Sequence, residues 1–183
     1  TVNIHGRVET EKDSEMQELV IATGAMPAED WVRARAHAYW NGLYFDKLFQ
    51  LPVIACRYLG CSPASSTHPT YRELIEVFSG GSLDPVEFPV LTQIRQFFEK
   101  MARDLQAGGL EYYHAPQWLD VYWPPDEYVF IQLVAEGALD RFYAEVERAL
   151  ALHTGVDPAM LASAVALNRA LLKLPLQIED AEV

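Results

Sequence analysis

The chain has 183 residues, half of them hydrophobic, and this length and composition fit one folded domain with a real core. Its net charge of −12 and the lack of a Lys/Arg cluster argue against nucleic-acid binding, because an acidic surface repels phosphate backbones. No apolar run reaches the ~18–20 residues of a membrane helix. Two cysteines, Cys56 and Cys61, are too few for a disulfide framework and favour a reducing, cytoplasmic setting.

The predicted elements begin with two short β-like runs, VNIHGRV at residues 2–8 and QELVIAT at residues 17–23, separated by a charged turn. They predict an N-terminal hairpin or the remnant of a larger sheet. The sequence starts with neither an initiator methionine nor a secretion signal, which suggests a piece of a longer chain.

Helices fill most of the remaining sequence. The first begins at Pro27 and is apolar over much of its circumference, so we expect it to be central. One of its sides carries Trp31, Ala34, Ala38, Asn41 and Tyr44. A second helix is predicted from about Pro52 to Leu59, and a short third one over residues 69–78, opened by Pro69.

The clearest helix runs from Pro89 to Gln106, where apolar residues recur at spacings of three and four. An aromatic loop, LEYYHAPQWLDVYW, follows and leads into WPPDEY. Pro125 suits a first helical position, so this motif predicts a stiff helix entry. Another helix follows Gly137, and Asp157 caps a last one that Pro175 ends. The sequence thus predicts a mainly α fold, a helical bundle with a short N-terminal β hairpin or strand pair.

No complete catalytic or metal-binding motif is present in the sequence. On a helix, residues five apart such as Cys56 and Cys61 point about 140° apart, so the two thiols are poorly placed to share a metal. His37 lies among aromatic residues, and we expect it to be packed and hydrogen-bonded rather than a ligand. The dense aromatic residues of the loop either fill a groove between helices or contact another domain. They are Tyr112, Tyr113, Trp118, Tyr122, Trp123 and Tyr128.

Several stretches, in order, carry a resemblance to a known family: TGAMPAEDWVRARAHAYW with FDKLFQLPV, WLDVYWPPDEYVFIQL, and LNRALLKLPLQIEDAEV. From Glu18 to Val183 the chain resembles the C-terminal region that follows the catalytic barrel in cobalamin (B12)-binding radical SAM proteins. The resemblance implies a parent enzyme with a cobalamin domain and a barrel whose [4Fe–4S] cluster cleaves S-adenosylmethionine. This chain has neither C-x₃-C-x₂-C nor D-x-H-x-x-G, so no catalytic, cofactor-binding or metal-binding residue carries over.

On this resemblance, residues 1–25 form a β element that links to an upstream barrel, and residues 26–183 form a helical, non-catalytic accessory domain. That domain would cover the barrel and shape the substrate pocket, with the barrel and cobalamin domains of the same polypeptide as partners and no nucleic acid or membrane. The candidate contact residues are Trp123, Asp126, Tyr128, Arg169 and Lys173, the last two four apart on the final helix. The alternative is a stand-alone helical protein-binding module that uses the aromatic loop. A small hydrolase would require titratable groups that converge in a pocket.

Overall fold

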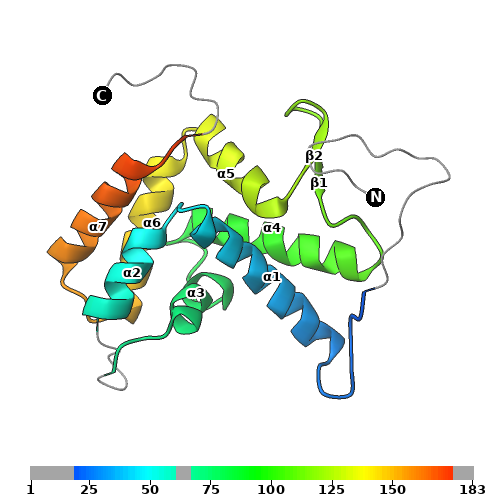
Figure 1. Ribbon diagram of the computed structural model, residues 1–183, viewed down its shortest axis with the longest axis horizontal. Helices are drawn as coiled ribbons and strands as arrows, with labels where there is room; N and C mark the ends of the chain where they lie inside the picture. The colour runs from blue at the N-terminus through cyan, green and yellow to red at the C-terminus, as the bar shows by residue number, and fades with distance from the viewer. Residues whose placement is uncertain (1–18, 61–66, 175–183) are drawn as a thin grey trace.

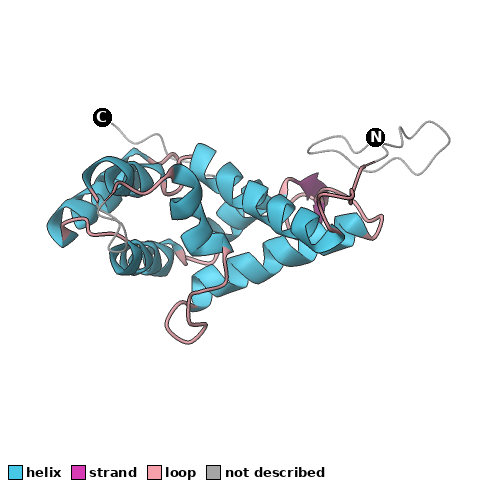
Figure 2. Ribbon diagram, turned by 90° about the horizontal axis from the view of Figure 1, so that it is seen from below, coloured by secondary structure: helices cyan, strands magenta, loops and turns pink. Residues whose placement is uncertain are grey.

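The computed structural model describes residues 19–60 and 67–174. Over these ranges the protein is mainly helical, with seven helices and a two-stranded antiparallel sheet (Figure 1). The helices are α1 (Ala28–Phe45), α2 (Gln50–Leu59), α3 (Tyr71–Ser79), α4 (Pro89–Gln106), α5 (Pro125–Ala135), α6 (Leu139–His153) and α7 (Pro158–Leu171), and the strands are β1 (Tyr113–Ala115) and β2 (Val121–Trp123). Helices α2, α6 and α7 gather at one end, and the hairpin lies toward the other (Figures 1 and 2).

The strand pair lies in the middle of the chain, and the prediction of an N-terminal pair is wrong for the described residues. The run at residues 2–8 lies outside them, and of residues 17–23 only 19–23 are described, where a single bridge joins Thr23 to Met26. The hairpin arises instead from the predicted aromatic loop, with His114 paired to Tyr122. Its five-residue turn contains no Asn-Gly or Asp-Gly signal, which is why the sequence pattern did not reveal it.

Proline marks three of the helix starts as predicted, whereas α1 begins at Ala28, directly after Pro27, and α2 begins at Gln50, two residues before the predicted Pro52. Pro89, Pro125 and Pro158 occupy the first position of α4, α5 and α7, where a missing N–H leaves no hydrogen bond unmade. The predicted cap of α7 is also confirmed, because the Asp157 side chain accepts a hydrogen bond of 3.0 Å from the backbone N–H of Ala159. These starts depend on local chemistry alone, so the sequence was sufficient to locate them.

Helix α3 begins later than predicted, at Tyr71 rather than Pro69. Thr70 and Glu73 form a capping box, in which the Thr70 hydroxyl accepts from the Glu73 N–H and the Glu73 carboxylate accepts from the Thr70 N–H. The Thr-x-x-Glu signature of this box can be read directly in the sequence. The box stabilises the start of α3, the helix that carries part of the candidate site.

Helix α1 is central, as predicted, but it buries a different face. It packs against α3, α4 and α5. Its buried residues are Val32, Ala36, Tyr39, Trp40 and Leu43, whereas Ala34 and Ala38 of the predicted stripe are exposed. Trp40 is fully buried, with its ring centroid 5.5 Å from those of Phe78 and Phe98. Apolar residues on several sides of α1 left the sequence pattern without one preferred face.

Two buried polar side chains connect helices that are distant in sequence. Glu145 of α6 accepts hydrogen bonds from the backbone N–H groups of Val90 (3.2 Å) and Leu91 (2.9 Å). Those donors belong to the first turn of α4, whose N-cap residue, Phe88, supplies no side-chain cap. Glu145 therefore satisfies N–H groups that a helix start leaves unpaired.

Asn168 of α7 plays a similar part at the start of α2. Its Nδ2 donates to the carbonyl oxygens of Leu48 (2.9 Å) and Lys47 (3.0 Å), and its Oδ1 accepts from the N–H of Leu51 (2.9 Å). Tyr143 adds a hydroxyl that donates to the Leu48 carbonyl at 2.7 Å. Side chains of α6 and α7, near the C-terminal end of the described residues, thus stabilise the turn between α1 and α2.

Candidate functional site

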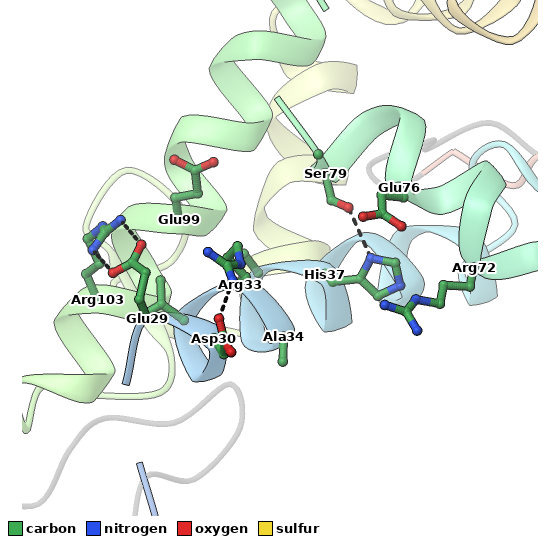
Figure 3. A pocket seen from close by; sticks show the side chains of 13 residues that line it. Glu29, Asp30, Arg33, Ala34, His37, Arg72, Glu76, Ser79, Glu99 and Arg103 are labelled. Atoms are coloured by element: carbon green, nitrogen blue, oxygen red, sulfur yellow. Dashed lines mark hydrogen bonds and ion pairs between the residues drawn. The ribbon is translucent and has the colours of Figure 1, made fainter. Parts of the chain in front are cut away.

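An open groove of about 690 Å³ lies between α1, α3 and α4, and its lining is rich in charged residues (Figure 3). Val32 and Ala36 of α1 supply buried apolar surface, and exposed Ala34 adds a small side chain. The polar residues that line the groove are Glu29, Asp30, Arg33, His37, Arg72, Glu76, Ser79, Glu99 and Arg103. The groove is of the size that proteins use for small ligands.

Most charges in this groove are already paired. The Arg103 guanidinium donates two hydrogen bonds to the Glu29 carboxylate, at 3.0 and 2.7 Å. Arg33 forms an ion pair with Asp30 one turn earlier on α1. Glu99 accepts a hydrogen bond from Arg95, outside the lining, at 2.8 Å. These pairs leave little net charge on the part of the groove that α4 and the start of α1 form.

His37 joins α1 to α3 at the other part of the groove. Its Nδ1 lies 3.0 Å from the Ser79 hydroxyl oxygen, and the side chain is half-buried, so the predicted hydrogen-bonded histidine is confirmed. Burial lowers the pKa of His37; the nearby Glu76 carboxylate raises it in part, and the Arg72 guanidinium lowers it further. The neutral imidazole is therefore favoured in the folded protein.

Arg72 and Glu76 stand out because, among the described residues, neither forms an ion pair. They are four residues apart on α3, and both act electrostatically on His37. Figure 3 shows the His37 ring between them, with Glu76 near Ser79 and Arg72 beside the ring's other nitrogen. A positive and a negative side chain are thus free on opposite sides of one imidazole.

The Ser79–His37 pair invites comparison with a catalytic nucleophile and its base. A base of that kind needs its second ring nitrogen held by a carboxylate or amide, which orients the ring and stabilises the imidazolium. Here Arg72 is the charged group beside that nitrogen, and its positive charge opposes the imidazolium (Figure 3). The geometry suits binding better than acyl transfer, so it gives no support to the hydrolase interpretation.

Three of the five candidate contact residues lie near the hairpin and the start of α5. The Trp123 indole N–H donates to the Trp118 carbonyl at 3.3 Å. Asp126, in the first turn of α5, lies against Gly42 of α1. Tyr128 is buried, with its ring centroid 4.2 Å from that of Tyr113.

Tyr128 and Tyr113 line a second groove of about 540 Å³ between α4, α5 and α6. Burial, together with the neighbouring Tyr113, raises the pKa of Tyr128 to about 12, so its hydroxyl stays protonated at neutral pH. These aromatic rings fill the space between helices, which was one of the two alternatives for the aromatic residues. Whether they also contact another domain stays a prediction.

The other two candidate residues belong to a different part of the molecule, around α7. Arg169 forms an ion pair with Asp140 of α6. Lys173 is exposed and follows the end of α7 at Leu171, so the prediction that both residues lie on one helix is wrong. The chain leaves the helix at Leu172, whose backbone is extended. The five residues therefore do not form one cluster.

The cysteines give no metal site within the described residues. Cys56 is buried, with its sulfur 3.6 Å from the Thr154 hydroxyl oxygen, as expected for a packed thiol. Cys61 lies outside the described residues. Throughout residues 19–60 and 67–174, no three His, Cys, Asp or Glu side chains are placed to hold a metal ion. The helices in these ranges also include none with the length and apolar character to cross a membrane.

Comparisons of the chain with protein-family models, with curated proteins and with solved structures gave no match.

Proposed function

We propose that this chain is the non-catalytic C-terminal accessory domain of a cobalamin-dependent radical SAM enzyme. Its role is to cover the barrel and shape the substrate pocket, in contact with the barrel and cobalamin domains of the same polypeptide. The [4Fe–4S] cluster, S-adenosylmethionine and cobalamin belong to those other domains. The family resemblance of the sequence supports the assignment, and the outer surface of α7 supports the idea of a covered domain.

The outer face of α7 is the observation that carries the proposal. Only one of its 14 residues, Arg169, is charged. An apolar stripe runs along the outer side of α7 with alternating spacings of four and three, through Met160, Ala164, Leu167 and Leu171, and Leu171 is 66% exposed. A helix that is apolar nearly all round is normally buried, and a stripe with this period fits against another helix. We infer that another part of the parent polypeptide covers this face.

The proposal is tested on the complete reading frame that encodes this chain. We expect the frame to encode C-x₃-C-x₂-C upstream, and the whole polypeptide to gain iron–sulfur absorbance after anaerobic reconstitution. Hydrogen exchange of α7 amides should be slower in the whole polypeptide than in this chain alone. Leu167→Glu with Leu171→Glu should remove that difference, whereas Val86→Glu, at an 88% exposed site in a loop, should not.

A frame without the cysteine motif, or equal exchange of α7 in both proteins, would refute the accessory-domain assignment. The alternative, a stand-alone helical protein-binding module, would then become the better explanation. A specific observation favours it: Phe45, Tyr58 and Tyr71 are exposed, and Arg57 lies over the rings of both tyrosines. Tyrosine and arginine are enriched at protein interfaces. This patch lies away from the aromatic loop from which the sequence predicted partner binding.

A further inference from the structure

The groove between α1, α3 and α4 contains an unused pair of opposite charges. Arg72 and Glu76 are exposed and, among the described residues of its lining, are the two charged side chains without an ion pair. A free charge on the surface is ordinary. Two free charges of opposite sign, one helical turn apart in one groove, require an explanation, because such pairs usually bond directly.

The position of His37 explains why Arg72 and Glu76 do not pair directly. The His37 ring, fixed by its hydrogen bond to Ser79, lies between them (Figure 3). The two charges are therefore kept apart, with their hydrogen-bonding capacity directed into the groove.

We propose that this groove binds a free α-amino acid, whose carboxylate meets Arg72 and whose ammonium meets Glu76. This inference does not depend on the accessory-domain assignment. A simple anion would be repelled by the Glu76 carboxylate and by the net charge of −12 on the protein. A simple cation would be repelled by the Arg72 guanidinium. A zwitterion satisfies both side chains at once. The Cβ atoms of residues four apart on a helix are about 5–6 Å apart, a span that a ligand with adjacent opposite charges can bridge.

His37 and the floor of the groove add to the recognition. When the Ser79 hydroxyl donates to Nδ1, the neutral imidazole carries its proton on Nε2, the nitrogen beside Arg72. That N–H then donates to the same ligand carboxylate. Ala34 and Ala36 leave room for a ligand side chain, and the remaining charges of the groove already have partners. The favoured ligand is an amino acid with a neutral side chain.

The test is calorimetric titration of the chain with L-leucine, L-leucine methyl ester, N-acetyl-L-leucine and inorganic phosphate. The ester lacks the carboxylate and the acetyl compound lacks the ammonium. We expect L-leucine to bind and each of the other three to bind at least about tenfold more weakly, because each loses a charge-assisted hydrogen bond. The NMR signals of the His37 ring should shift with L-leucine at the same concentrations.

Two variants locate the site. Arg72→Gln and Glu76→Gln, both at exposed positions, should each weaken L-leucine binding about tenfold or more while leaving the thermal melting temperature unchanged. Lys100→Gln, an exposed change on α4 outside the groove lining, is the matched control and should bind as the parent does. No binding at about 10 mM L-leucine, equal binding of N-acetyl-L-leucine or phosphate, or binding that survives Glu76→Gln would each overturn the proposal.

Discussion

Replacement of Glu145 tests whether a carboxylate from α6 holds the start of α4. The side chain is 4% exposed, and its two oxygens accept from the N–H groups of Val90 and Leu91. Glu145→Gln keeps one acceptor oxygen and places an NH₂ group against the second donor. Glu145→Leu fills similar space but leaves both buried donors without a partner.

The magnitudes follow from the number of hydrogen bonds lost. A hydrogen bond to a charged group contributes about 1.5–3 kcal/mol, and an unsatisfied buried donor costs about 1–3 kcal/mol. We therefore expect Glu145→Gln to lower the free energy of unfolding by about 2 kcal/mol and Glu145→Leu by about 4 kcal/mol. The second value is a large share of the stability of a domain of this size.

Urea unfolding of the parent and the variants, followed by circular dichroism, measures these differences. Glu147→Gln is the matched control, because it removes a carboxylate two residues further along α6 that caps no helix, and it should change stability by less than about 0.5 kcal/mol. If both Glu145 variants unfold at the same urea concentration as the parent, the carboxylate does not cap α4 and the reasoning fails.

Three further changes follow from the same structure. Asn168→Asp places a carboxylate against two carbonyl oxygens, so it should lower the free energy of unfolding by about 3 kcal/mol at pH 7 and by less at pH 4. Urea unfolding at both pH values measures this, and an equal loss at pH 7 and pH 4 would contradict it. Burial and the charges of two acids on α5 raise the pKa of Asp46 to about 6, so its ionisation destabilises the fold as pH rises from about 4 to 6. Asp46→Asn should therefore stabilise the protein by about 1 kcal/mol above pH 6, after allowance for solvent screening, and should have no effect below pH 4. Thermal melts across this pH range check the prediction, and a lower melting temperature at pH 7 would contradict it. A Cβ at Gly42 would overlap the Asp126 carboxylate, so Gly42→Ala should lower the melting temperature. Adding Asp126→Ala to this variant should recover most of the loss, and no recovery would show that the clash lies elsewhere.

Helix starts could be predicted from the sequence because their causes lie within a few residues. Pro89, Pro125 and Pro158 each mark a first helical position, and Asp157 caps its own helix. The hairpin was missed because its turn lacks a glycine signal and uses Leu119 and Asp120 at positive φ. The buried face of α1 was misjudged because three neighbouring helices cover it, and a periodic pattern cannot resolve a helix that is apolar on most sides.

The candidate site was harder to predict than the fold. Its residues come from three helices, and only His37 was singled out, as a packed and hydrogen-bonded side chain. The spacing of Arg72 and Glu76 is visible in the sequence, but an i, i+4 pair of opposite charge is ordinarily an exposed salt bridge. Only the position of His37 between them shows that the two charges are separate (Figure 3). The contacts that Glu145 and Asn168 make with backbone groups of other helices were equally invisible, since those groups lie 54 to 121 residues away.

The packing of α2 against α7 has a consequence for how the protein is made. The hydrogen bond between Asn168 and Leu51 joins residues 117 positions apart in the sequence, and α2 packs more extensively against α7 than against any other helix. During translation α2 leaves the ribosome well before α7, so the surface of α2 that packs against α7 stays uncovered until the last helix is made. At about 5–20 residues per second that delay lasts several seconds or more, during which a ribosome-associated chaperone has an apolar segment to shield.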